Sequence, residues 1–381
     1  MNILHIAPYY APAYAFGGVV SALEGLTQAQ AQQGHSVTVL TTDALTRTER
    51  YTGVMQETRA GVQVIRIPNA LYALRRWNLS SPFGLPRALN RLSPDVIHLH
   101  EFRTVENFLA LPTLKRIPTV LSPHATLRYD TGRGLVKQAW DRLISPRVAP
   151  AVRAIVALTA QEQHEIEQVW RAIVSKAPPI HIVPNGVDLE MFAHLPDGAA
   201  FRQTYGIPPG DTIILFMGRL HARKGVNVLV KAFQRAKLSN AWLVLAGPDE
   251  GMEERLRTIT GERVILTGFI SGEERLQAMS AADLFVLPAV GEGLSMAVLE
   301  ALAAGLPVIL SPGCNLPETE ARGAGLIVPP EEIPLAEALT RLVNDPHRRE
   351  TMSQRAQTWA RETFSWPRIA AQMMEIYESV M

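Results

Sequence analysis

The sequence predicts an α/β protein built from two Rossmann-like domains, and three observations lead to this prediction. Short runs rich in Val and Ile alternate along the whole chain with segments of helical periodicity, which is typical of βαβ units with parallel sheets. Most of these runs are apolar at nearly every position, as expected for strands that helices cover on both faces. The pattern also restarts after residues 196–210, which are rich in Pro, Gly and Asp, and 381 residues suffice for two domains.

The first half of the chain contains seven expected strands. Helical periodicity follows the first of them at residues 20–33, and another helix is expected at residues 160–169. The expected strands are residues 3–7, 36–41, 62–67, 95–100, 119–122, 154–158 and 180–183.

The second half repeats the alternation and ends in a helical tail, residues 348–381, which is broken near Trp366 and Pro367. The expected strands are residues 212–217, 242–246, 264–267, 284–287, 308–310 and 325–328. We therefore predict an N-terminal Rossmann-like domain over residues 1–190, a C-terminal one over residues 191–364, and a closing helix over residues 365–381. In domains of this kind, ligands bind beyond the carboxyl ends of the strands, here in a deep cleft between the two domains.

The composition is that of a globular protein, with 47% hydrophobic and 19% charged residues. No apolar run reaches the ~18–20 residues of a membrane span, and residues 1–7 resemble a strand more than a signal peptide. Cys314 is the only cysteine, which excludes an internal disulfide and a cysteine-rich metal site. We expect a cytoplasmic protein.

Charge is distributed unevenly along the chain. Residues 1–185 hold 19 Lys and Arg against 12 Asp and Glu, a balance of +7, and the remainder holds 18 against 24, a balance of −6. A basic first half would attract an anionic acceptor or an anionic membrane surface. Scatter in surface composition explains the difference equally well.

The most informative motif runs from Glu292 to Glu300. A strand ends at Leu287, a glycine-bearing loop follows, and we expect a helix from about Leu294, with unpaired backbone N–H groups at its start that suit a diphosphate. Glu292 then lies just before the helix and Glu300 about two turns inside it. A structural role explains Glu292 as a helix cap, but Glu300 stands in a helix that is apolar nearly all round, where a carboxylate needs a partner.

A second motif places Arg219 and Lys224 after the strand at residues 212–217 and before an expected helix at residues 225–236. Two cations near the positive end of a helix are unfavourable unless an anion joins them. A diphosphate would satisfy both charges and the helix amides together. The alternative is a pair of solvated surface cations.

Two further features follow strands of the first half. Gly17 and Gly18 stand before a helix, where paired glycines let a backbone amide approach a phosphate, although an ordinary turn explains them equally well. His124 follows the strand at residues 119–122, and we expect it to project into the cleft, where it could donate a hydrogen bond or shuttle a proton. A lone His is more often structural. We expect His98 and His100 to face opposite sides of their strand, with His100 the nearer to the acceptor and no metal site between them.

In these motifs the chain resembles glycosyltransferase family 4, the retaining nucleotide-sugar transferases of the GT-B fold, whose signature is a Glu-x7-Glu motif at a Gly/Leu-rich helix start. The resemblance implies that Glu292 contacts the donor sugar and Glu300 the ribose, and that Arg219 and Lys224 hold the diphosphate. It places His124 next to the transferred sugar, with Glu292, Arg219 and Lys224 as the other residues of the catalytic centre. The remaining donor-binding residues that it implies are Gly17, Gly18, Gly218, Gly247, Phe269, Ile270, Gly293, Leu294 and Ser295.

The resemblance also bears on substrates and cofactors. It implies a hexose donor, for which UDP-glucose or a related UDP-sugar is the most frequent in the family, and a glycan or lipid-linked saccharide acceptor, as in exopolysaccharide or lipopolysaccharide assembly. No Asp-x-Asp occurs, so we expect no metal and no other cofactor, and no phosphate-loop or dinucleotide motif is present. We expect no nucleic-acid partner. A non-catalytic nucleotide-sugar-binding protein and a GT-B nucleotide-sugar 2-epimerase are the alternatives.

The acceptor side of the chain is the hardest to interpret. Residues 71–77, Leu-Tyr-Ala-Leu-Arg-Arg-Trp, mix apolar and basic side chains, and Arg87 and Arg91 follow them. This composition suits a patch that binds an anionic membrane peripherally, at the inner face of the cell membrane. It suits an ordinary amphipathic helix equally well.

Overall fold

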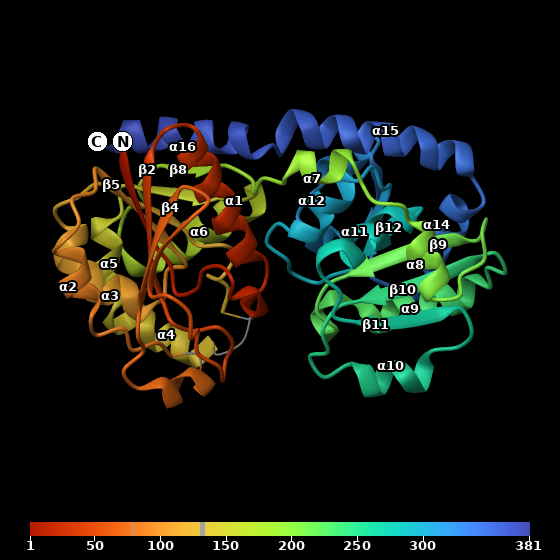
Figure 1. Ribbon diagram of the computed structural model, residues 1–381, viewed down its shortest axis with the longest axis horizontal. Coiled ribbons are helices and arrows are strands. Elements are labelled where there is room, and N and C mark those ends of the chain that lie inside the picture. Colours follow the sequence, from red (N-terminus) through yellow and green to blue (C-terminus); the bar gives the residue numbers. More distant parts are fainter. Residues whose placement is uncertain (78, 130–133) are drawn as a thin grey trace. The chain divides into compact units, whose positions relative to one another are not determined.

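The computed structural model describes residues 1–77, 79–129 and 134–381, and the side chains of residues 76 and 77 lie outside this description. The chain forms two compact units (Figure 1). The first unit consists of Met1–Gly186 together with Trp366–Met381, and the second consists of Val187–Ser365. Each unit has its own sheet of mostly parallel strands and its own covering helices. Among the described residues, no helix has both the length and the apolar character needed to cross a bilayer.

The first unit contains an eight-stranded sheet in the order β3-β4-β2-β1-β5-β6-β7-β8. Every neighbouring pair is parallel except β3 and β4, which are antiparallel. The edge strand β3 was not predicted, because its sequence Gln-Glu-Thr-Arg is polar throughout and lacks the alternation that marks a half-buried strand. The strands are β1 Asn2–Ile6, β2 Ser36–Thr42, β3 Gln56–Arg59, β4 Val62–Ile67, β5 Val96–His100, β6 Thr119–Ser122, β7 Ala154–Ala157 and β8 Ile180–Ile182.

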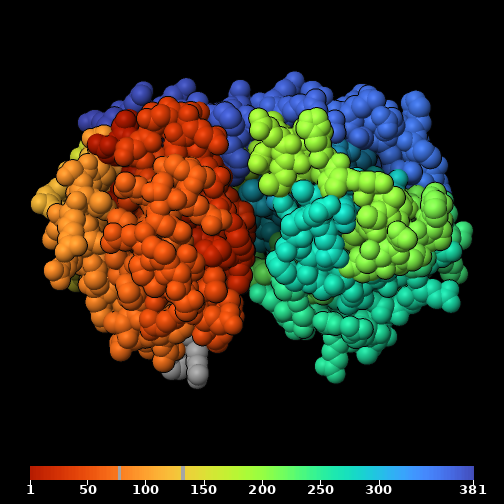
Figure 2. All heavy atoms as spheres, in the orientation of Figure 1, coloured from red at the N-terminus to blue at the C-terminus, as the bar shows by residue number. Residues whose placement is uncertain are grey.

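Helices pack on this sheet, and the last helix of the chain is one of them. The helices of the unit are α1 Gly18–Gln32, α2 Leu85–Leu89, α3 Val105–Leu114, α4 Gly134–Leu143, α5 Ser145–Val148, α6 Ala160–Ile173 and α16 Trp366–Val380. Helix α16 contacts α1, and an added Cβ at Gly25 of α1 would overlap the Trp366 ring, so a glycine is needed for this close approach. In the space-filling view, the outer side of α16, in blue, lies at the surface of the unit (Figure 2).

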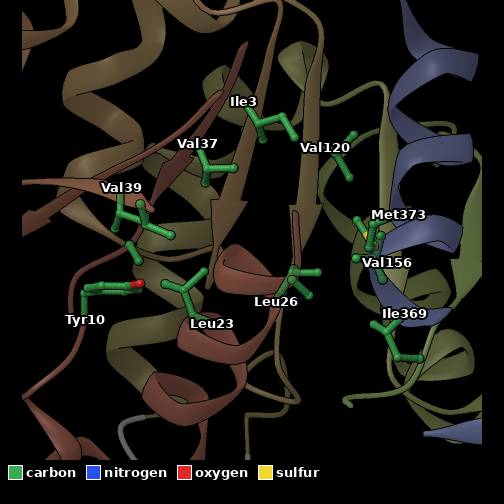
Figure 3. Packing of buried hydrophobic residues seen from close by; sticks show 14 of the residues in the cluster. Ile3, Tyr10, Leu23, Leu26, Val37, Val39, Val120, Val156, Ile369 and Met373 are labelled. Carbon is green, nitrogen blue, oxygen red and sulfur yellow. The ribbon is translucent and has the colours of Figure 1, made fainter. Parts of the chain in front are cut away.

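The core on this side of the sheet draws on distant parts of the sequence. Figure 3 shows Leu23 and Leu26 of α1, Ile369 and Met373 of α16, and strand residues such as Ile3 in one apolar cluster. All of these side chains are buried. Since burying a large aliphatic side chain contributes about 1.5–3 kcal/mol, these contacts account for the docking of α16 on the first unit.

The second unit contains a six-stranded, fully parallel sheet in the order β11-β10-β9-β12-β13-β14. Its strands are β9 Thr212–Met217, β10 Ala241–Ala246, β11 Val264–Gly268, β12 Leu284–Leu287, β13 Val308–Leu310 and β14 Gly325–Ile327. Its helices are α7 Leu189–Ala193, α8 Ala199–Thr204, α9 Val226–Ala236, α10 Glu253–Ile259, α11 Gly272–Ala281, α12 Met296–Ala303, α13 Glu318–Ala321, α14 Glu332–Val343 and α15 Pro346–Thr363.

Both sheets reverse their strand order at one point, and these points locate the candidate sites. In the first unit the order reverses between β1 and β5, and in the second between β9 and β12. Ligands of doubly wound sheets bind beyond the carboxyl ends of the strands at such a switch point. The segments that begin at Ala7, Glu101, Gly218 and Pro288 leave the sheets at these positions.

Candidate functional site

In the second unit, the loops after β9 and β12 are joined by several polar contacts. Lys224 Nζ lies 2.7 Å from Glu292 Oε2, and both side chains are largely buried. Arg223 donates a hydrogen bond from Nη2 to the Gly291 carbonyl at 2.7 Å, and its own carbonyl accepts one from the Val290 amide at 2.7 Å. The structure thus brings two of the predicted site residues, Lys224 and Glu292, into direct contact at the switch point.

A glycine makes this junction possible. Gly225 has φ 72°, in the left-handed region that favours glycine, and an added Cβ would overlap the Pro288 carbonyl. The left-handed conformation of Gly225 lets the 3-10 turn Ala222–Lys224 end before α9 begins at Val226. As a result, the Lys224 side chain can approach the loop after β12.

Arg219 has a different partner. Its Nη1 lies 2.8 and 2.9 Å from the two carboxylate oxygens of Glu250, a residue that follows β10. This pair is exposed, with 45% of the Arg219 side chain accessible. Exposed ion pairs contribute only about 0–1 kcal/mol, so a more highly charged anion can take the place of Glu250 at small cost.

The sequence argument for a diphosphate was therefore incomplete. It held that two cations at a helix start need an anion, and the protein itself supplies carboxylates to both Arg219 and Lys224. The cations remain candidates for binding phosphate, but their presence at the helix start does not by itself require a ligand. Glu250 was missed because nothing in the sequence pairs it with a cation 31 residues earlier.

The start of α12 differs from the predicted one. The helix begins at Met296 with Ser295 as N-cap, and not near Leu294. Glu300 is consequently its fifth residue, just over one turn inside and not two. Glu292 is fixed in the preceding loop, where its amide donates to the Gly313 carbonyl at 2.8 Å and its carbonyl accepts from Asn315 Nδ2 at 2.5 Å.

Glu300 has the partner that its apolar helix requires. Arg275 of α11 places Nη1 at 2.5 Å from Glu300 Oε2. Burial raises the pKa of Glu300, and the neighbouring Arg275 guanidinium opposes that rise. The sequence predicted the need for a partner but gave no means of naming Arg275, because the contact depends on how α11 packs beside α12.

The other predicted donor residues of this unit follow the carboxyl ends of β9, β10, β11 and β12. The Gly218 amide, after β9, donates to the Ala246 carbonyl at 2.9 Å, and the Gly247 amide, after β10, donates to the Gly268 carbonyl at 2.8 Å. Phe269 is 68% exposed, whereas Ile270 is buried. Leu294 and Ser295 are buried and Gly293 half-buried, so the segment just before α12 offers backbone more than side chain to a ligand.

In the first unit, the paired glycines stand at the beginning of α1. Gly17 is the N-cap residue, with φ 92°, and Gly18 is the first helical residue. Both follow β1, at the switch point of the sheet. The Gly17 position has open space around it, since an added Cβ would meet nothing within 4 Å.

His124 lies two residues after the end of β6 in a left-handed backbone conformation, with φ 55°. Its Nε2 is 2.9 Å from His100 Nδ1, and burial lowers the pKa of His124 to about 4. The prediction that His98 and His100 face opposite sides of their strand was wrong. Their rings lie 4.2 Å apart, because residues two apart on a strand share a face.

The basic segment at residues 71–77 also differs from the predicted surface patch. Its residues Tyr72–Trp77 form a 3-10 turn, and Arg75 is buried, with its guanidinium 4.9 Å from the centre of the Tyr9 ring. Arg75 is therefore not part of a membrane-facing patch. The side chains of Arg76 and Trp77 lie outside the described residues.

Comparison with known proteins agrees with this geometry. The model of the family described as "Glycosyltransferase Family 4" matches residues 16–191, and that of "Glycosyl transferases group 1" matches residues 197–359. An uncharacterised glycosyltransferase of Methanocaldococcus jannaschii is 26% identical over 100% of this chain and 99% of its own. A GDP-mannose-dependent alpha-(1-6)-phosphatidylinositol dimannoside mannosyltransferase of Mycobacterium tuberculosis is 26% identical over 98% of this chain and 95% of its own.

Among solved structures, Anabaena HepE in complex with UDP-glucose superposes with a TM-score of 0.78 at 19% identity, covering all of both chains. The two family models between them match most of the sequence, and the chain belongs to the glycosyltransferases of family 4, with the GT-B fold. It is a transferase that uses a nucleotide-sugar donor, which confirms the family and the fold predicted from the Glu292–Glu300 and Arg219–Lys224 motifs.

Proposed function

We propose that this protein is a metal-independent, retaining hexosyltransferase that moves a hexose from a nucleotide-sugar, with a UDP-hexose such as UDP-glucose as the first candidate, to a glycan or lipid-linked saccharide. The observation that carries the proposal is the joining of the loops after β9 and β12 by Lys224 and Glu292, with Arg219 and Glu300 on the same two segments. The switch point of a doubly wound sheet is where ligands of such sheets bind.

The residues divide into roles by charge. Arg219 and Lys224 hold the diphosphate and stabilise the negative charge that develops on the nucleotide as it leaves. Glu300 accepts hydrogen bonds from the ribose, and Glu292 orients the donor sugar while its carboxylate stays near Lys224. The glutamates bind and orient, and neither is a nucleophile.

The first unit supplies neutral groups. The family resemblance assigns Gly17 and Gly18 to the donor phosphate and His124 to the transferred sugar. The open space at Gly17 supports the first assignment, and the position of His124 after β6 supports the second. The acceptor hydroxyl then attacks on the face from which the nucleotide departs, so that the anomeric configuration is retained.

The same residues support the proposal of metal independence. With Arg219 and Lys224 present, two fixed cations neutralise the leaving diphosphate, the task that a divalent cation performs in other sugar transferases. Transfer should therefore continue at full rate in excess EDTA.

The choice of donor rests on relatives with different preferences. Anabaena HepE has been solved with UDP-glucose, and the mycobacterial relative uses GDP-mannose. Phe269 is exposed and Ile270 is buried, which does not distinguish one base from another, so the base must be determined by experiment.

Peripheral membrane association has support from a different segment than the predicted one. Helix α4 exposes Leu135, Val136 and Leu143, the first with 82% of its surface accessible. Arg142 and Arg147 are exposed next to them. An apolar helix face flanked by cations suits an anionic membrane surface that carries a lipid-linked acceptor. Co-sedimentation with liposomes of phosphatidylglycerol, lost in a Leu135→Glu/Leu143→Glu variant, would support this association, and equal binding to neutral liposomes would contradict it.

The function is tested by supplying hexose-labelled UDP-, GDP- and ADP-sugars in EDTA, with glycan and lipid fractions as acceptors. We expect label to move onto one acceptor fraction with release of one nucleoside diphosphate, and the new anomeric centre to keep the donor's configuration. Conversion of the donor hexose without an acceptor would indicate the 2-epimerase instead. Donor binding with neither transfer nor hydrolysis would indicate a non-catalytic sensor.

A further inference from the structure

A continuous chain of hydrogen-bonded side chains runs through the interior of the first unit and ends at His124. It connects α16 and α1 with the three central strands β1, β5 and β6. We call it the histidine chain. Its bonds are Tyr377 Oη to Gln30 Nε2, 3.1 Å; Gln30 Oε1 to His5 Nε2, 2.8 Å; His5 Nδ1 to His100 Nε2, 2.9 Å; and His100 Nδ1 to His124 Nε2, 2.9 Å. A side branch joins Tyr377 Oη to His98 Nδ1, 2.7 Å, and His98 Nε2 to Ser122 Oγ, 2.8 Å.

The imidazoles of this chain are neutral. His5, His98 and His100 are fully buried. Burial lowers the pKa of His5 to about 4 and the pKa values of His98 and His100 well below their ordinary value, and the neighbouring imidazoles lower the last two further. Each ring therefore has one N–H and one lone pair near neutral pH.

The direction of the whole chain follows from one amide. Gln30 turns its Oε1 to His5, and an amide oxygen only accepts, so the proton of His5 lies on Nε2. His5 Nδ1 must then accept from His100 Nε2–H. By the same reasoning His100 Nδ1 accepts from His124 Nε2–H. The last member, His124, is thereby held as the Nε2–H tautomer, with a lone pair on Nδ1.

Tyr377 is coupled to the orientation of that amide. In the observed orientation its hydroxyl accepts from Gln30 Nε2, which leaves the hydroxyl proton for His98 Nδ1 at 2.7 Å. Turning the amide would oblige the Tyr377 hydroxyl to donate to Gln30 instead, and every proton in the chain would move to the other nitrogen of its ring. Gln30 and Tyr377 thus determine whether His124 Nδ1 accepts or donates.

The open end of the chain indicates a ligand. Among the described residues, His124 Nδ1 has no hydrogen-bond partner although it is inaccessible to solvent. It is the one imidazole nitrogen of the histidine chain in that state. A buried acceptor without a donor is destabilising, and a hydroxyl group of a bound substrate would satisfy it. A small cavity of about 20 Å³ beside His98, His100 and His124 shows that the interior here is not completely filled.

A metal ion is the competing explanation for such a cluster. The ring nitrogens of His5, His98 and His100 include a set that lies within 4.8 Å of one another, as metal ligands would. Each of the six nitrogens of these rings already has a hydrogen-bond partner at 2.7–2.9 Å. A metal would have to break several of these bonds inside the core, and the observations favour the hydrogen-bonded chain.

We propose that Gln30 and Tyr377 are positioning residues that hold His124 in the Nε2–H tautomer, so that its Nδ1 accepts a hydrogen bond from a hydroxyl group of the bound sugar. The inference rests on the proposed function, which places His124 beside the transferred sugar. It adds a requirement that His124 alone does not explain, namely two residues that touch no substrate and act through the buried imidazoles of His5 and His100.

The tautomer can be observed directly. The full-length protein, which has ten histidines, is labelled with ¹⁵N-histidine, and two-bond ¹H–¹⁵N correlations are recorded at pH 7.5, with His124 assigned by His124→Asn. We expect His124 to have its proton on Nε2 in the wild type and to populate both tautomers in Gln30→Met and in Tyr377→Phe. The control is Thr27→Val. Thr27 lies on α1 one turn before Gln30, and this substitution removes a buried hydrogen bond to Tyr10. It should leave the tautomer of His124 unchanged. A proton on Nδ1 in the wild type, or an unchanged tautomer in both chain variants, would overturn the proposal.

Activity provides the second readout. Gln30→Met and Tyr377→Phe should each lower kcat about three- to tenfold, the worth of one hydrogen bond, with unchanged donor affinity and with Thr27→Val at the wild-type rate. If no donor binds to the wild type, the proposed function fails, while the NMR spectrum still decides the tautomer. A stoichiometric transition metal in the purified protein, lost in His98→Ala, would overturn the hydrogen-bonded chain in favour of a metal site.

Discussion

The two units carry their candidate residues near equivalent places, the switch points of two largely parallel sheets, yet the chemistry of these residues is opposite. In the second unit the residues are acidic and basic side chains that form ion pairs: Lys224 with Glu292, Arg219 with Glu250 and Arg275 with Glu300. In the first unit they are the neutral imidazoles of the histidine chain, whose low pKa values keep them uncharged. The same architecture therefore supports a charged site and an uncharged one.

This difference matches two halves of one reaction. A nucleoside diphosphate is highly charged and its leaving requires cations, whereas a sugar presents hydroxyl groups that need only hydrogen bonds. Of the ion pairs in the second unit, Arg219–Glu250 is exposed to water, whereas Lys224–Glu292 and Arg275–Glu300 are largely buried. The histidine chain depends on burial, since burial is what keeps the rings neutral and their tautomers coupled.

The largest expected effect on activity comes from removing a cation from the charged site of the second unit. Arg219→Ala should lower kcat/KM about 100-fold or more, because it removes a charge opposite the leaving diphosphate. The matched control is Arg257→Ala, an exposed arginine of the same unit that is ion-paired with Glu253. Steady-state kinetics with the natural donor checks this, and near-normal turnover of Arg219→Ala would contradict the role.

Substitutions in the Arg275–Glu300 pair distinguish a role of Glu300 in donor binding from a role in the stability of the fold. Arg275→Met leaves the Glu300 carboxylate largely buried without its cation, so we expect about 2 kcal/mol lower stability in urea unfolding together with weaker donor binding. Adding Glu300→Gln to this variant should restore much of the stability and none of the donor affinity. Recovery of donor affinity in the double variant would show that Glu300 is structural.

The uncharged site should respond more mildly. His124→Asn is expected to lower kcat about tenfold or less, since it removes hydrogen bonds and no charge, with donor affinity retained. Isothermal titration and initial rates measure the two effects separately. A loss of activity in His124→Asn as large as that in Arg219→Ala would contradict the proposed difference between the two sites.

The smallest expected effect is on the pH dependence of stability. The pKa of His124 is lowered to about 4 in the folded protein from an ordinary 6.5, so the unfolded chain binds more protons between these values. The contribution of neutral His124 is fully present above pH 6.5 and is lost as pH falls towards 4. Urea unfolding at pH 7.5, 6 and 5 should therefore show a smaller acid-induced loss in His124→Asn than in the wild type, and parallel curves would contradict this.

The parts of the structure that follow from local pattern could be predicted from the sequence. Apolar runs of four to six residues, such as 119–122 and 212–217, gave strands with the same bounds in the structure. Strand β3 was missed because polar edge strands have no such pattern. The start of α12 was placed two residues early, since Leu294 and Ser295 have helix-compatible residue types but the chain turns into the helix only at Met296.

The candidate site was predictable in its members and not in their partners. Glu292, Glu300, Arg219 and Lys224 stand in sequence motifs, whereas Glu250 and Arg275 become partners only through packing. The histidine chain was out of reach for the same reason. Gln30 and Tyr377 are separated by 347 positions and meet because α16 packs on α1.

The most direct test of the central claim, that the second unit binds a nucleotide-sugar through its charged residues, is a thermal-shift series without added metal. UDP, GDP, ADP and CDP and their common hexose derivatives would be compared on the wild type, Arg219→Ala, Glu300→Ala and the control Arg257→Ala. We predict that one nucleotide raises the melting temperature of the wild type and of Arg257→Ala, and that this rise is reduced or lost in the other two. A flat response to all nucleotides, or an equal rise in all four proteins, would contradict the claim.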